Sequence, residues 1–282
     1  MKPNISIAVI IYTLSLTCIT HSIGQAAIQE PKQHQSYILN SIYKPGSTYL
    51  SQVDVELATN IEMGTNPVLS DKRSRTMAIS LTTENGSNGD VPFKLTFTDF
   101  HENSTGELSE PEFDIKMDTR IAGASGDIEG GHLAVKNVCG VEPIYLDDMQ
   151  NVLKPVFELA YLHFPKKAMK KGDSFQNRFS VDYPLGAMGL VKTKQDMVVT
   201  LLSVENNIAN LGIETIVSGT FVHEGVSYPV TGGGKSLMTL DIENQFFISF
   251  EKNHTDVISF KSNGTDITVR STEISRNRTS IN

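Results

Sequence analysis

The chain has 282 residues and a formal net charge of −8, which argues against nucleic acid or an anionic membrane surface as a partner, since both select basic patches. Hydrophobic residues make up 39% of the sequence, and a chain of this length can bury a sizeable core in one or two domains. Its basic side chains gather only at Lys166, Lys167, Lys170 and Lys171, where a solvated connector is expected.

Residues 1–24 have the organisation of a secretory signal peptide. Lys2 precedes an apolar run from Ile5 to Ile19, and small residues follow it. The run is too short for a bilayer-spanning helix, which needs about 20 residues. Cleavage is expected after Gly24, with Ala26 as the alternative. We therefore expect a periplasmic or secreted protein with no stable membrane span after cleavage.

The sequence contains two cysteines, and cleavage would remove one of them. The residues before Cys18 do not supply the small side chain that a lipoprotein cleavage site requires. A mature chain whose single thiol is Cys139 forms no internal disulfide, so its stability must come from buried apolar surface. Cys139 could act as a nucleophile only beside a histidine, and a buried, unreactive side chain is expected instead.

A polar lead-in over residues 25–45 is expected to be flexible and precedes the first strand signal. From Gly46 onward, apolar and polar residues alternate, as a strand with one buried face requires. Turn-rich segments such as residues 84–90 separate the alternating runs. This pattern predicts an N-terminal antiparallel β lobe over residues 46–144. Its expected strands lie at residues 49–57, 76–82, 93–100, 113–121 and 132–138.

Residues 145–171 are predicted to form a short amphipathic helical connector. Between Leu146 and Phe164, apolar side chains recur every three or four residues, which indicates a helix with one buried face. Pro155 either kinks this helix or begins a second one, and Pro165 ends it.

Alternation resumes over residues 172–282, which are predicted to form a C-terminal β lobe similar to the first. Residues 46–49 align with residues 172–175, and residues 81–85 align with residues 202–206, which indicates an internal duplication. The expected strands lie at residues 174–183, 196–204, 209–217, 220–223, 226–230, 236–242, 246–251, 256–261 and 265–274. The predicted fold class is mainly β, with two similar antiparallel lobes, as a curved sheet or half-barrel, joined by the short amphipathic helical connector.

Two glycine-rich segments resemble nucleotide-binding motifs, but the secondary structure expected around each of them does not fit such a motif. The run Gly232–Ser236 ends like a phosphate-binding loop, but the first glycine of that motif would fall on Pro229 and a strand follows where a helix is required. We expect a glycine-rich bend there. The run Gly123–Gly126 has neither a preceding strand-helix pattern nor a following helix, and we expect a turn.

No residue is assigned a catalytic, cofactor-binding or metal-binding role, and no cofactor is expected. No two histidines stand at a ligand spacing, and no Gly-x-Ser-x-Gly motif surrounds a serine. An acidic stretch lacks the dense Asp/Asn-Gly pattern of a calcium loop, and we expect it to be solvated. The histidines that remain after cleavage are His34, His101, His132, His163, His223 and His254; the acidic residues are Glu107, Glu110, Glu112 and Asp114.

Two segments resemble a family of bacterial exported, two-lobed β-rich proteins of unknown function. Residues 164–175 match its signature of a proline, a short basic and apolar stretch, and then Gly-Asp-Ser and an aromatic residue. Residues 233–242 with residues 246–249 are similar to its glycine-led late hairpin. The resemblance implies a fold with a central helix and implies no active site. The chain departs from the family at Phe175, where a tryptophan is common.

These observations favour an exported protein that is not an enzyme and that binds a lipid or another apolar ligand in a half-barrel. The alternatives are an envelope protein-protein interaction module that uses a strand edge or lobe surface, and an uncharacterised hydrolase with a cleft that joins Cys139 or a histidine to a carboxylate. The apolar side chains considered for ligand contact are Met149, Val152, Phe157, Phe246 and Phe250.

Overall fold

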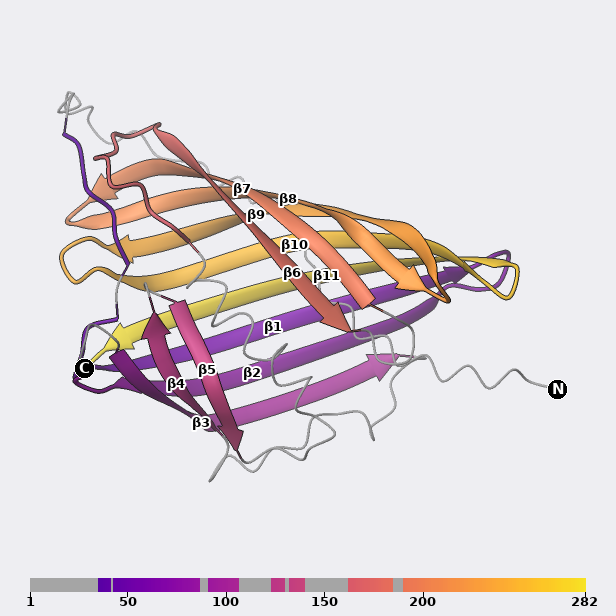
Figure 1. Cartoon of the computed structure of the whole chain (residues 1–282), viewed down its shortest axis with the longest axis horizontal. Helices are drawn as coiled ribbons and strands as arrows, with labels where there is room; N and C mark the ends of the chain where they lie inside the picture. Colours follow the sequence, from indigo (N-terminus) through magenta and orange to yellow (C-terminus); the bar gives the residue numbers. More distant parts are fainter. Residues whose placement is uncertain are drawn as a thin grey trace, which may run out of the picture.

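The computed structural model describes residues 35–41, 43–86, 91–106, 123–129, 132–139, 162–184 and 190–282. These ranges contain no helix, and therefore none that could span a membrane. Their strands form one antiparallel sheet that does not close (Figure 1). The strands are β1 (Thr48–Met63), β2 (Leu69–Thr83), β3 (Val91–Gly106), β4 (Gly123–Glu129), β5 (His132–Cys139), β6 (Ser174–Pro184), β7 (Leu190–Glu205), β8 (Ile208–His223), β9 (Val226–Asp241), β10 (Phe246–Ser262) and β11 (Thr265–Ile281).

The strand order across the sheet is β6-β7-β8-β9-β10-β11-β1-β2-β3-β4-β5. Nearly every strand pairs with its neighbour in the chain, as hairpins do. The exception is a central seam where β1 pairs with β11, from Tyr49 opposite Ile281 to Met63 opposite Ile267. The predicted mainly β, antiparallel fold is confirmed, and strands from both predicted halves share one sheet. The division into two lobes and the internal duplication stay predictions.

Three hairpins close through two-residue turns whose residues both adopt left-handed backbone. The turns are Asn206–Asn207, Glu224–Gly225 and Asn263–Gly264, with φ between 50° and 78°. Such turns twist in the same sense as the strands they join, which keeps the long strands paired up to the turn. Asn and Gly accept this conformation readily, whereas Glu224 does so at a steric cost.

Alternate residues of each long strand are buried on the same side of the sheet, which we call the inner face. In Figure 1 the edge strands β6 and β4–β5 cross the middle strands steeply, which gives the sheet a strong curvature. The inner face carries three apolar clusters. The first contains Tyr49, Val53, Val55, Met77, Ile79, Leu81, Phe93, Leu95, Phe97, Ala124, Ile128 and Phe246. The third contains Ile61, Val191, Phe221, Val230, Ile258, Ile267 and Val269.

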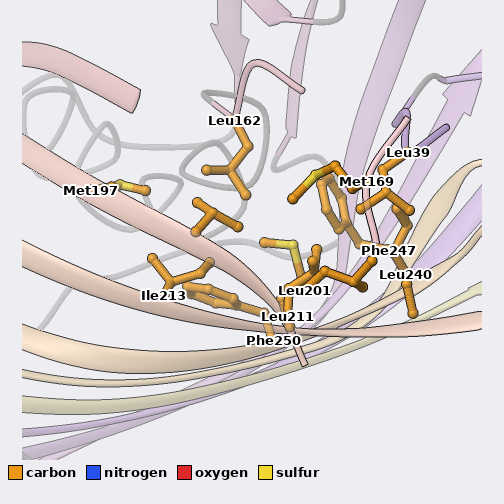
Figure 2. Packing of buried hydrophobic residues seen from close by; sticks show 13 residues of the cluster. Leu39, Leu162, Met169, Met197, Leu201, Leu211, Ile213, Leu240, Phe247 and Phe250 are labelled. Atoms are coloured by element: carbon orange, nitrogen blue, oxygen red, sulfur yellow. The ribbon is translucent and has the colours of Figure 1, made fainter. Parts of the chain in front are cut away.

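The second cluster is covered by two segments from outside the strands (Figure 2). Leu39, Leu162 and Met169 lie over strand residues such as Leu211 and Phe250. A pair of backbone hydrogen bonds between residues 37 and 169 ties the two segments together, at 2.8 and 2.7 Å. The expected polar lead-in thus contributes a leucine that is only 2% exposed. The four lysines near residue 168 are exposed, as expected of a solvated connector.

Two details of the strand prediction are wrong. Residues 123–126 are not a turn, because they lie in β4. A Cβ atom on Gly123 would lie 2.3 Å from the Leu95 carbonyl oxygen, so glycine is needed for close approach to β3. The breaks expected after residues 217, 230 and 251 also do not exist, because β8, β9 and β10 run through them for 16 or 17 residues. Glycines and inward-facing polar residues obscure the alternation at these points.

Several predictions lie outside the described residues. These are the signal peptide at residues 1–24, the acidic stretch and the strand at residues 113–121, and most of the helical connector. Of the expected helix, the structure describes only residues 162–164, which are not helical.

Candidate functional site

A belt of polar side chains crosses the inner face between the apolar clusters. On β2 it separates Leu69 from Met77, and on β10 it separates Ile258 from Phe250. The polar belt consists of Asp71, Arg73 and Arg75 on β2, Glu102 on β3, Lys252, His254 and Asp256 on β10, and Ser271, Glu273 and Ser275 on β11.

The β2–β3 part of the belt holds two arginines and two carboxylates in contact. Arg73 Nε donates to Asp71 Oδ2 at 3.0 Å, and Arg75 Nη2 donates to Glu102 Oε1 at 2.8 Å. Arg73 Nη1 lies 3.8 Å from the same Glu102 oxygen. All four side chains are at most 7% exposed. Burial of such ions is tolerated only when partners replace the lost water.

A β-bulge brings Glu102 into this group. The register between β2 and β3 shifts between Ala78 and Ile79. Phe97 and Glu102 therefore both face inward, although one residue number is odd and the other is even. An uninterrupted alternation from Phe97 would have pointed Glu102 outward. The sequence therefore gives no sign of this ion pair, since single bulges leave no clear sequence pattern.

The β10–β11 part of the belt joins a histidine, a lysine and two carboxylates. His254 Nε2 lies 2.9 Å from Asp256 Oδ1, and Lys252 Nζ lies 3.8 Å from Glu273 Oε1. Gly232 pairs with Asp256 on the neighbouring strand, and a Cβ atom at position 232 would lie 1.7 Å from Asp256 Oδ1. The glycine run is therefore not the expected bend. It is the interior of strand β9, where missing side chains make room for the belt.

The polar belt contains buried atoms that have no hydrogen-bond partner in the described structure, among them Arg73 Nη1, Glu273 Oε1 and Ser275 Oγ. Arg73 and Glu273 are both paired with Leu57 of β1, from opposite sides. Buried polar atoms without a partner are rare in folded proteins. Their occurrence on β2 and β11, which flank β1, on one face of the sheet marks this part of the belt as the candidate site.

The side chains considered from the sequence are distributed differently. Phe246 and Phe250 are buried in the first and second clusters, whereas Met149, Val152 and Phe157 lie outside the described residues. The described ranges hold no group of three or more metal-ligating side chains. Of the histidines, His254 belongs to the belt, His223 stacks on Phe221, His101 and His163 are exposed, and the side chains of His34 and His132 are outside the description.

Cys139 is exposed, and the expectation of a buried thiol is wrong. It is the last residue of the edge strand β5, where its Sγ lies 3.6 Å from the Gly123 carbonyl oxygen. It borders an open groove of about 810 Å³ on the outer face, beside Lys94 and Lys136. Among the described residues that line the groove there is no histidine to act as a base.

A tyrosine pair lies at the edge of the first cluster. The rings of Tyr43 and Tyr49 meet edge to face at 5.1 Å, and Tyr49 Oη accepts a hydrogen bond from the Lys44 backbone N–H at 2.7 Å. Burial raises the pKa of Tyr43 far above its usual value, and the neighbouring Tyr49 adds to the effect. Burial also raises the pKa of Tyr49, against the opposing effect of its hydrogen bonds.

These shifts predict a loss of stability at alkaline pH. The unfolded phenols release their protons near pH 10, whereas the folded ones retain them. The contribution of these two tyrosines to the free energy of unfolding should therefore be constant below about pH 10 and fall as the pH rises further. Phenolate absorbance during an alkaline titration should show a late-ionising group that Tyr43→Phe removes. An unchanged titration curve in that variant would assign the late ionisation elsewhere.

Of the comparisons with known proteins, the one with solved structures finds matches. No family model matches the chain, and no curated protein does. Among solved structures, it is similar to one described as "Lipid-protein interactions in lipovitellin", with a TM-score of 0.46 and 13% sequence identity. The match covers 85% of this chain, and this chain spans 26% of the length of that one.

Proposed function

We propose that the chain is an exported protein, not an enzyme, that holds a lipid or another apolar ligand against the inner face of its sheet. The third apolar cluster carries this proposal. All of its described members lie on strands of the sheet, whereas described residues outside the strands, in the ranges 35–41 and 162–170 and at Tyr43, pack on the first and second clusters.

An apolar sheet face is stable in water only when a second layer covers it. A bound acyl chain would become part of the layer over the third cluster, whose buried members are at most 6% exposed. Each buried methylene group contributes about 0.8 kcal/mol, so that a long chain supplies ample binding energy even after ordering costs. Phe221, Phe260 and Tyr228 offer adaptable aromatic contacts, with ring centroids 5.1 to 6.0 Å apart.

The test is to purify the protein from an exporting host, extract it with organic solvent and identify bound molecules by mass spectrometry. We expect a lipid in near-stoichiometric amount. Phe260→Asn places a polar group on the third cluster and should lower the bound amount several-fold. Ile216→Asn, at a position 67% exposed on the outer face, is the matched control and should leave it unchanged. Ligand-free protein with an intact fold would contradict the proposal.

A second candidate function is an interaction module for another envelope protein, and an exposed apolar patch on the outer face of β7–β9 favours it. Its members are Val198, Leu202, Ile216 and Leu237, which are 38 to 67% exposed. Apolar side chains grouped on a surface often mark a protein contact. A photo-crosslinker at position 216 should then give a discrete adduct in cells, whereas one at the exposed Glu205 should not.

A further inference from the structure

We propose that the polar belt binds the head group of a zwitterionic amphiphile, one that carries an anionic phosphoryl oxygen and an ammonium group. This inference rests on the proposed function and specifies the class of ligand. Its basis is a set of buried atoms that have no hydrogen-bond partner, Arg73 Nη1, Glu273 Oε1 and Ser275 Oγ, of which the first two lie 3.8 Å from an oppositely charged group.

The charges of the belt favour a ligand with no net charge. Its four carboxylates, on Asp71, Glu102, Asp256 and Glu273, face two arginines, one lysine and the imidazole of His254. Charges of both signs therefore stand side by side in the belt. A ligand with net charge would add an uncompensated charge to a buried site, which is costly. A zwitterion adds none.

The unpartnered atoms define which groups the ligand should present. Arg73 Nη1 is a cationic donor and suits an anionic phosphoryl oxygen. Glu273 Oε1 is an anionic acceptor and suits the N–H of an ammonium group. Lys252 Nζ, at 3.8 Å from Glu273 Oε1, is too distant to satisfy that oxygen with a hydrogen bond. Ser275 Oγ can donate or accept.

The spacing of the strands fits a short head group. Arg73 and Glu273 stand on β2 and β11, two strand intervals apart across Leu57, so their backbones are separated by roughly 10 Å. Arg73 leans toward Glu102 on β3 and Glu273 toward Lys252 on β10, so an ethanolamine phosphate that bridges the two draws both side chains toward β1. One row of polar side chains, Asp71, Thr59 and Ser271, separates Arg73 and Glu273 from the third cluster, and an acyl chain attached to the head group reaches the cluster across that row.

The test compares three single-chain probes with the same palmitoyl chain by equilibrium dialysis below their micelle concentrations. These are lysophosphatidylethanolamine, lysophosphatidylcholine, which lacks an ammonium N–H, and lysophosphatidylglycerol, which is anionic. We expect the ethanolamine probe to bind the delipidated full chain about tenfold more tightly than either of the others. Glu273→Gln, which keeps the side-chain shape, should remove this preference. Glu251→Gln, on the outer face of β10, is the matched control and should retain it.

Arg73→Lys provides a second variant that keeps the positive charge but loses the planar donor pair. It should weaken all three phosphate-bearing probes by a similar factor. Equal binding of the three probes to the unmodified protein, or a preference that survives Glu273→Gln, would overturn the head-group site while the apolar-ligand function stands. Failure of every probe to bind would overturn both.

Discussion

Replacing Glu102 with alanine should lower the free energy of unfolding by about 3–5 kcal/mol, because the change removes one partner from a buried ion pair. The Glu102 side chain is 2% exposed, and its carboxylate lies 2.8 Å from Arg75 Nη2 and 3.8 Å from Arg73 Nη1. Without it, Arg75 loses its 2.8 Å carboxylate contact and Arg73 keeps that with Asp71, in a region shielded from water. Urea unfolding followed by circular dichroism measures the effect.

The matched control is Glu214→Ala. Glu214 pairs with Lys235 at 2.8 Å, the same distance as in the buried pair, but both side chains are about two-thirds exposed. Water already solvates these charges, so the loss should be below about 1 kcal/mol. If both substitutions lower the free energy of unfolding equally, burial does not strengthen the ion pair between Arg75 and Glu102.

Replacing Gly234 with alanine should destabilise the protein by roughly 2–3 kcal/mol, since an added methyl group has no room there. Its Cβ atom would lie 2.2 Å from the Asn253 carbonyl oxygen and 2.6 Å from His254 Cα. Both are backbone atoms of the paired strand, so relief requires the separation of β9 from β10. The same movement would disturb His254 and the adjacent belt. Thermal unfolding of the purified variant tests this result.

Gly212→Ala is the control for the glycine substitution. Its Cβ atom would meet only the side chain of Leu202, at 3.2 Å, and Leu202 is 42% exposed and can move. Alanine also restricts the unfolded chain more than glycine does, which offsets part of any strain. The stability should therefore change by less than about 0.5 kcal/mol. A large loss here would indicate that any glycine replacement in these strands is harmful.

Much of the fold could be predicted from the sequence because long strands with one buried face alternate visibly. The runs in β1 and β11 show this, and the Asn263–Gly264 turn marks its hairpin directly. Strand β4 could not be recognised from the sequence. Its Gly123 allows the backbone to approach β3 closely, and only the pairing of the two strands shows this. The seam between β1 and β11 was equally hidden, because no local pattern specifies which distant strands pair.

The candidate site was not predicted. Its charged residues lie on strands whose alternation would ordinarily place apolar side chains inward, so they read as interruptions of the pattern. Arg73 and Arg75 stand in phase with the buried Met77, which is a signal that could have been noticed. Glu102 could not have been placed, because the bulge that turns it inward is defined by the pairing of β2 with β3. The exposure of Cys139 was not predicted, because the residue at which strand β5 ends depends on how that strand pairs in the sheet.

The central seam also sets an order of events during synthesis. Strand β1 is made well before its partner β11, since paired residues such as Thr59 and Ser271 are 212 positions apart. At typical rates of about 5–20 residues per second, β1 waits roughly 10 to 40 s with one edge unpaired. An unpaired edge can join the wrong strand, in the same chain or in another. We therefore expect this protein to depend on a factor that protects β1 until β11 arrives.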